Sequence, residues 1–133
     1  MTHDDQATAM RALSGLEQGD FQPFDEWLSD DVTWTITGDT PWSKTYEGKP
    51  AVRRMLRSLQ GRLDAPFRMQ LKRSIAAGDM LVIEARGENR LLDGRRYDNT
   101  YCWVCRLEGG RLRELTEYMD TALVLRSFGS SDR

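Results

Sequence analysis

The sequence predicts an α+β domain in which helices cover one face of a curved, mostly antiparallel sheet. Helical periodicity prevails in the first half of the chain, up to Gln60. After Pro66, four strand-like runs follow one another, separated by short turns that contain glycine. Helices followed by an antiparallel meander are the pattern of an α+β fold.

Length and composition limit the class of protein. A chain of 133 residues accommodates one domain and one core, so we expect a single domain over residues 1–133. The formal net charge of −2 provides no basic surface for nucleic acid or an anionic membrane. The apolar runs are too short to span a bilayer. We therefore expect a cytoplasmic protein with no nucleic-acid or membrane partner.

Start and stop signals delimit three helices in the first half. Thr2 and Asp5 form a capping box for the first helix, which Gly19 ends. Asp20 is placed to cap a second, short helix over FQPFDEWL, and Pro50 suits the first turn of a third. The apolar stripe of the third helix consists of Val52, Met55, Leu56 and Leu59. Its opposite side, with Arg53, Arg54 and Arg57, is expected to be solvated.

The strands follow from residue alternation. Val32, Trp34 and Ile36 alternate with polar residues in DDVTWTIT, which predicts a first strand. Residues 38–48 are rich in turn formers and predict a loop. The later strand-like runs are residues 67–77, 80–91, 97–107 and 111–121. We expect a disordered tail over residues 127–133.

Two glycine turns predict the pairing of the last three strands. Asp93-Gly94 indicates a two-residue hairpin loop. That register pairs Arg86 with Tyr101, Glu84 with Trp103, and Glu88 with Asn99. Residues 108–110 predict a three-residue loop with Gly110 in the left-handed conformation, which pairs Tyr101 with Glu117.

These registers gather charged and aromatic side chains on one face of the sheet. That face holds Glu84, Arg86, Glu88, Asn99, Tyr101, Trp103, Leu115, Glu117 and Met119. If it were solvated, its ion pairs would be weak and its aromatic residues would form an exposed apolar patch. If it were covered, it would have the mixture typical of a small-molecule pocket. A shorter loop at Gly109-Gly110 would instead turn Tyr118 and Asp120 inward and Glu117 outward.

The cysteines do not predict a metal or redox site. Cys102 and Cys105 form a C-x-x-C pattern, but on a strand this spacing puts the two thiols on opposite faces. His3 is the single histidine, which also argues against triad chemistry. We therefore expect no metal and no cofactor.

The order and spacing of several short motifs resemble the SnoaL-like branch of the nuclear-transport-factor-like superfamily. The motifs are GD (19–20), DDVTW (30–34), YEGKPAV (46–52), DG (93–94), YDNTYCWV (97–104) and GGRLRELTEYMD (109–120). The resemblance covers nearly the whole chain and implies a conical barrel, with three helices closing a strongly bent sheet over a pocket. It also implies a homodimer formed through the outer face of the sheet, where we expect Ile83, Cys102, Val104 and Tyr118.

Members of this superfamily include ketosteroid isomerases, polyketide cyclases, epoxide hydrolases and dehydratases. Aligned with the isomerases, the base position falls on Ile36, the tyrosine position on Ala12, and the second acid near Cys102 or Trp103. The catalytic groups of the ketosteroid isomerases are therefore missing from this sequence. Aligned with the epoxide hydrolases, the arginine falls on Glu84 and the two acids on Arg86 and Glu117, while Trp34 and Ile36 take the water-holding positions. The sequence therefore keeps two acids and one arginine at these three positions, but the arginine and the first acid have exchanged places.

The resulting expectation is a cofactor-free acid/base enzyme acting on a hydrophobic small molecule, with aromatic and polycyclic compounds among the candidates. The reaction classes are cyclisation, isomerisation, dehydration and hydrolysis, and the alternative is a non-catalytic binding or dimerisation module. The candidate catalytic residues are Glu117, Arg86, Glu84 and Asp120. The candidate binding residues are Trp34, Ile36, Tyr46, Met55, Leu59, Glu88, Asn99, Tyr101, Trp103 and Met119.

Overall fold

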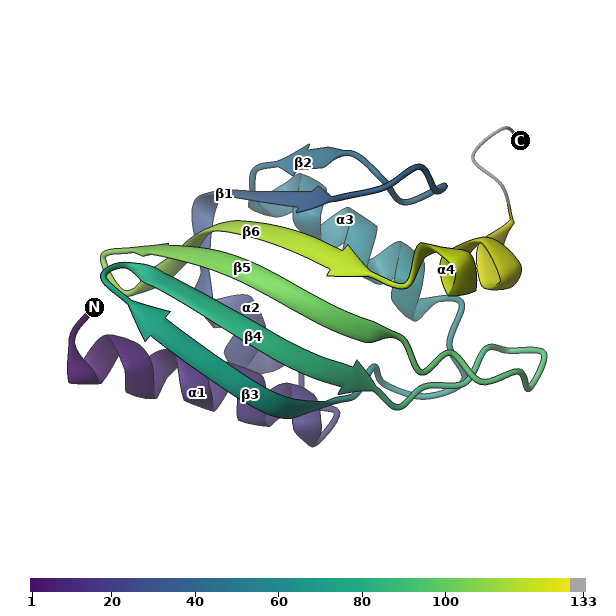
Figure 1. Cartoon of the computed structure of the whole chain (residues 1–133), viewed down its shortest axis with the longest axis horizontal. Coiled ribbons are helices and arrows are strands. Elements are labelled where there is room, and N and C mark those ends of the chain that lie inside the picture. Colours follow the sequence, from purple (N-terminus) through teal and green to yellow (C-terminus); the bar gives the residue numbers. More distant parts are fainter. Residues whose placement is uncertain (130–133) are drawn as a thin grey trace.

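A computed structural model describes residues 1–129, which form one six-stranded sheet and four helices (Figure 1). The elements, in chain order, are α1 (His3–Glu17), α2 (Gln22–Trp27), β1 (Leu28–Ile36), β2 (Thr45–Glu47), α3 (Lys49–Gln60), β3 (Met69–Ala77), β4 (Met80–Gly87), β5 (Thr100–Glu108), β6 (Arg111–Met119) and α4 (Thr121–Phe128). No helix in this part of the chain combines the length and hydrophobicity needed to cross a membrane.

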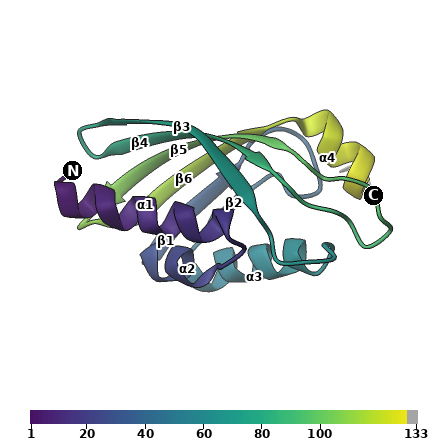
Figure 2. The ribbon, with the colours of Figure 1, turned by 90° about the horizontal axis from the view of Figure 1, so that it is seen from below.

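The sheet has the order β2-β1-β6-β5-β4-β3, and every neighbouring pair is antiparallel except β1 and β6. It is strongly curved but remains open, with β2 and β3 at its edges. Figure 2 shows α1, α2 and α3 together on one side of the sheet and α4 at its end. The α+β prediction is therefore confirmed, in the form of an open curved sheet covered by helices on one face.

The capping signals of the first helix act as predicted. Thr2 accepts a hydrogen bond from the backbone N–H of Asp5, and the Asp5 carboxylate accepts one from the backbone N–H of Thr2. The helix then buries small and branched residues, including Ala9, Ala12 and Leu13, against the sheet. Small residues at these positions allow α1 to lie close to the strands.

The first hairpin differs from the prediction by one residue. Its loop has three residues, 92–94, because the backbone N–H of Leu91 donates to the carbonyl of Arg95 at 2.8 Å and Gly94 adopts a φ of 93°. A loop longer by one residue moves the register by one position and exchanges the faces of β4. Cys102 therefore pairs with Glu84, and Thr100 with Arg86.

This shift reverses which side chains of β4 point inward. Ile83 lies opposite Trp103, and Ala85 lies opposite Tyr101, and both are buried. The expectation that Glu84 and Arg86 share a face with the aromatic residues of β5 is thus wrong. Ile83, expected on the outer face, is fully buried under the helices.

In the second hairpin, between β5 and β6, the residues on the inner face are those predicted, although the loop length and the register both differ from the prediction. Its loop is the two-residue Gly109-Gly110, with positive φ at both glycines, 60° and 80°. A register shift beside Leu107 adds one residue to β6 and restores the alternation. Glu117 consequently pairs with Trp103 rather than Tyr101, a displacement of two residues that leaves Glu117 on the inner face. The alternative that turns Glu117 outward is excluded.

Two elements are absent from the sequence prediction. Within the predicted loop, β2 pairs with β1 through Trp34 and Tyr46. After β6, the helix α4 begins at Asp120, whose carboxylate accepts from the backbone N–H of Leu123 at 3.2 Å. Ser127 and Phe128 therefore belong to a helix and not to a disordered tail, whereas residues 130–133 lie outside the described residues.

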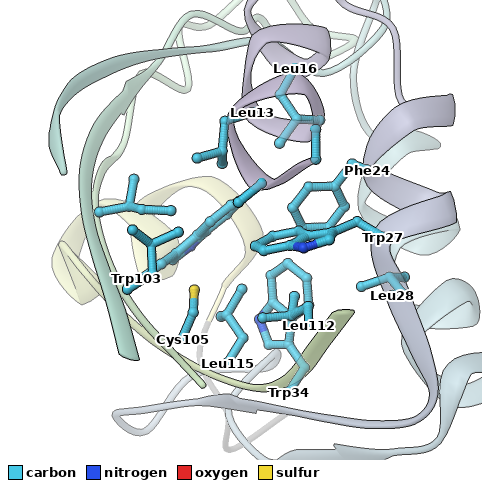
Figure 3. Close-up of a cluster of buried hydrophobic side chains, with 14 of the residues drawn as sticks. Leu13, Leu16, Phe24, Trp27, Leu28, Trp34, Trp103, Cys105, Leu112 and Leu115 are labelled. Atoms are coloured by element: carbon cyan, nitrogen blue, oxygen red, sulfur yellow. The ribbon is translucent and has the colours of Figure 1, made fainter. Parts of the chain in front are cut away.

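The core lies between the concave face of the sheet and the helices. Figure 3 shows side chains of α1 and α2, such as Leu13 and Phe24, meeting Trp34 and Trp103 from the strands. Trp34 and Trp103 pack edge to face, with ring centroids 5.4 Å apart. Aromatic pairs of this geometry hold both rings in fixed orientations, which matters for the site described next.

Candidate functional site

A cavity of about 520 Å³ lies between the concave face of the sheet and helices α2 and α3. Its volume is within the usual range for small-molecule sites. The apolar and aromatic lining residues are Leu16, Phe21, Phe24, Trp34, Ile36, Trp42, Met55, Leu56, Leu59, Phe67, Tyr97, Tyr101, Trp103 and Met119. Glu117 is the one carboxylate from the sheet among the lining residues.

Glu117 is held in the cavity wall by two tryptophans. Its two carboxylate oxygens each accept one indole N–H, from Trp34 and from Trp103, at 3.1 Å. Its backbone carbonyl accepts from both the N–H and the hydroxyl of Thr37, at 3.1 and 2.8 Å. Only 6% of the residue is exposed. The carboxylate is therefore fixed in orientation and shielded from bulk water.

The environment of Glu117 favours a mobile proton. Burial raises the pKa of its carboxyl above the usual value, and the two indole bonds act against this rise without cancelling it. Within residues 1–129, no lysine or arginine forms an ion pair with Glu117. Because an indole can only donate, neither tryptophan can accept a proton held by Glu117. A carboxyl in this state is suited to exchange a proton with a ligand.

Two tyrosine hydroxyls form a second polar group in the cavity. Burial raises the pKa of Tyr97 to about 12 and raises that of Tyr101 well above its usual value. The Tyr97 hydroxyl accepts a hydrogen bond from the side-chain amide of Asn99 at 3.3 Å, and each of the two tyrosines influences the pKa of the other. Both phenols remain protonated at neutral pH and can serve as hydrogen-bond donors.

The mouth of the cavity lies at α2 and α3. Arg53 donates two hydrogen bonds to the carboxylate of Asp25, at 2.8 and 2.7 Å, and these bonds lower the pKa of Asp25. Arg57 and two glutamines, Gln22 and Gln60, complete the polar rim. The prediction that the arginines of this helix form only a solvated face is therefore wrong for Arg53, which joins α3 to α2.

The structure gathers part of the predicted site. The predicted residues that line the cavity are Trp34, Ile36, Met55, Leu59, Tyr101, Trp103, Glu117 and Met119. Asn99 is fully buried behind the lining and contacts it through Tyr97.

The other candidates lie elsewhere. Glu84 is on the outer face in an ion pair with Arg73, and its side chain is 45% exposed. Arg86 and Glu88 are also exposed. The Tyr46 hydroxyl donates to the carbonyl of Trp42 and not into the cavity. Asp120 caps α4, so none of these residues is part of the cavity wall.

Sequence reasoning missed several lining residues, among them Tyr97, Phe24 and Trp42. A signal existed for Tyr97, because the alternation of Asn99, Tyr101 and Trp103 extends back to it. The pairing of Asp25 with Arg53 had no such signal, since the two residues are far apart in the sequence and only the packing of α2 beside α3 brings them together.

Comparisons with known proteins agree with this fold. The profile of the SnoaL-like domain matches residues 9–115, whereas no curated protein matches the sequence. An NTF2-like protein of unknown function from Burkholderia pseudomallei K96243 is 20% identical, with a TM-score of 0.83 over 97% of this chain and 100% of that one. TerC co-crystallised with polyporic acid is 17% identical, with a TM-score of 0.79 over 95% and 98%. An LEH-like epoxide hydrolase from M. tuberculosis is 23% identical, with a TM-score of 0.73 over 95% and 92%.

Proposed function

We propose that this chain, which belongs to the SnoaL-like domain family, is an enzyme that binds a hydrophobic small molecule and uses Glu117 as its general acid and base. The reaction belongs to the isomerisation, cyclisation, dehydration or hydrolysis classes, and it needs no cofactor. The aromatic wall and the volume of about 520 Å³ suit a flat ligand with several rings.

One observation carries this proposal: a buried carboxyl with a raised pKa lies in the wall of an apolar cavity and forms no ion pair within residues 1–129. A carboxyl kept only for stability would be expected to pair with arginine or lysine, as Asp25 does with Arg53. Glu117 instead has two neutral indole donors, which orient the carboxylate and still allow it to take up a proton. Such tuning is typical of a general acid or base that works near neutral pH.

The geometry narrows the reaction classes. The acid–arginine–acid arrangement implied by the epoxide-hydrolase resemblance is not supported, because Glu84 and Arg86 lie outside the cavity. Glu117 therefore works with two indole donors rather than with a guanidinium. Because TerC, which has the same fold, was co-crystallised with polyporic acid, that compound is a reasonable first choice of ligand.

A non-catalytic binding module remains the second candidate, because the aromatic cavity alone would retain an apolar ligand. We also propose a homodimer formed through the outer face of the sheet. Cys102 and Val104 lie there partly exposed, beside Tyr118, which is 49% exposed. Size-exclusion chromatography with light scattering would measure the oligomeric state.

The test is a turnover screen with hydrophobic ketones and epoxides, followed by Glu117→Gln on any compound that reacts. This substitution keeps the size of the side chain and removes its exchangeable proton, so we expect kcat/KM to fall at least about tenfold. Glu114→Gln is the matched control, because Glu114 is exposed on the same strand in an ion pair with Arg106. Its rates should equal those of the unchanged protein.

Unchanged turnover in Glu117→Gln would contradict the proposed role of Glu117. If compounds from the screen bind tightly and none reacts, the binding module is the better description. The two outcomes are separated by measuring binding calorimetrically on the same compounds.

A further inference from the structure

The Tyr97 hydroxyl is a polar group of the cavity to which the chemistry proposed for Glu117 assigns no role. Tyr97 lines the cavity and is 2% exposed, and its ring packs edge-on against Phe128 with centroids 5.0 Å apart. The ring is therefore fixed, and the direction of its hydroxyl is set by the neighbours of the oxygen.

The orientation of the Asn99 side-chain amide decides whether the Tyr97 oxygen accepts a hydrogen bond from it. The Asn99 side-chain oxygen accepts two backbone N–H groups, from Thr100 at 2.7 Å and from Asp120 at 3.0 Å. Its amide nitrogen donates to the carbonyl of Asp120 at 3.2 Å. A flipped amide would lose these bonds, so the nitrogen must face Tyr97. The Tyr97 oxygen consequently accepts a hydrogen bond from Asn99.

The Tyr97 proton has no acceptor in the described part of the chain. The Tyr97 oxygen accepts the hydrogen bond from Asn99, and a hydroxyl oxygen that accepts still has its own proton to donate. Within residues 1–129, no hydrogen bond is formed in which the Tyr97 hydroxyl is the donor.

We infer that Tyr97 donates its proton to a neutral oxygen of the ligand, so that the cavity selects hydrophobic molecules bearing a carbonyl group. This inference rests on the proposed function and specifies its substrate class. The amide donor on the Tyr97 oxygen polarises its O–H bond and strengthens the hydrogen bond that it can give. Tyr97 is thereby a specificity-determining residue, and Asn99 and Phe128 position it.

The negative charge of Glu117 explains why the ligand oxygen that accepts from Tyr97 should be neutral. The carboxylate of Glu117 contributes to the raised pKa of both tyrosines, so it is close enough to act on a ligand at Tyr97. A ligand carboxylate there would be repelled by Glu117 and would lose its hydration, and the arginines among the lining residues, Arg53 and Arg57, lie on α3 at the rim and not beside Tyr97. A ketone or quinone carbonyl needs only the one donor.

The test compares two probes of the same shape, acetylnaphthalene and ethylnaphthalene, which differ in a carbonyl oxygen. Calorimetry measures both affinities for the unchanged protein and for Tyr97→Phe. We expect the substitution to weaken binding of the ketone about fivefold to tenfold and that of the hydrocarbon less than about twofold, since only the ketone loses a hydrogen bond. Tyr118→Phe, which removes an exposed hydroxyl on the outer face, is the control and should change neither.

Infrared spectroscopy gives an independent reading. The carbonyl stretch of bound acetylnaphthalene should lie at lower frequency than in hexane, and Tyr97→Phe should abolish this shift. The shift should persist between about pH 6 and pH 9, because the pKa of Tyr97 is about 12. Asn99→Asp is a second variant should Tyr97→Phe fold poorly, since it replaces the donor by an acceptor that captures the Tyr97 proton.

Equal losses for the two probes, an unchanged ketone affinity, or a hexane-like carbonyl frequency in the unchanged protein would each overturn the inference. These measurements are made at equilibrium without turnover. A failure here therefore leaves the role of Glu117 untouched, and a failure of Glu117→Gln to slow turnover leaves the binding result interpretable.

Discussion

Glu117 and Glu84 lie on the same sheet, on opposite faces, and their surroundings differ in every property that matters for chemistry. Glu117 is buried, is held by two indole N–H groups and has a raised pKa. Glu84 is about half exposed and pairs with Arg73 on the outer face. The same residue type is a candidate acid on one face and a surface ion pair on the other. Register, which sets the face, therefore decides the chemistry.

The largest expected effect tests which face of β4 is buried. Ile83→Ala should lower the free energy of unfolding by about 3 kcal/mol, because it empties a fully buried position opposite Trp103. Val82→Ala, one residue earlier on the partly exposed face, should cost less than half as much. Urea unfolding of the two variants measures the difference. The register predicted from the sequence would give the reverse order.

A smaller effect is expected for Glu117, the buried member of the pair, when one of its two hydrogen-bond donors is removed. Trp34→Phe keeps an aromatic ring but removes one N–H donor from Glu117. Because that bond holds the pKa of Glu117 down, its loss should raise the pKa further and move the Glu117 limb of the pH–rate profile to higher pH. The loss in unfolding free energy should be about 1–2 kcal/mol near neutral pH.

The pH dependence of stability has a defined sign. The folded protein binds the Glu117 proton more tightly than the unfolded chain does, so this group's contribution falls as pH rises from the usual glutamate pKa through the folded one. Trp34→Phe should extend this pH range to higher pH, because it raises the pKa of Glu117 in the folded protein. An unmoved pH–rate limb together with the stability loss would mean that Trp34 has only a packing role.

The smallest expected effect lies on the outer face. Glu84→Gln removes one partner of an exposed ion pair, and exposed pairs contribute little to stability. Its unfolding midpoint and its turnover should equal those of the unchanged protein. A loss of activity in this variant comparable to that of Glu117→Gln would contradict the assignment of the two faces.

Local signals in the sequence predicted much of the fold. The capping box of Thr2 and Asp5 and the helix-starting Pro50 act within a few residues of themselves, so neighbouring sequence is sufficient to read them. The hairpin loops are different. Asp93-Gly94 fits a two-residue loop and also the last two positions of a three-residue loop, and the sequence contains no local feature that separates the two.

That single ambiguity accounts for most of the misplaced site residues. Tyr101, Trp103 and Glu117 were predicted on one face, and they do line the cavity. Glu84 and Arg86 were added to that face by the loop length alone. The burial of Leu81, Ile83 and Ala85 shows which register wins, since it puts three apolar side chains inside and two charged ones outside.

The sequence by itself determined the first three helices, the strands of the meander and the shared face of the β5 and β6 residues, because each depends on periodicity or on a short turn. Only the tertiary structure decided which face is covered, that β2 and α4 form, and that Asp25 meets Arg53. It also decided that Glu117 has two indole donors rather than an arginine. These features depend on contacts between residues far apart in the chain, and their free energies are set by burial, which no local pattern contains.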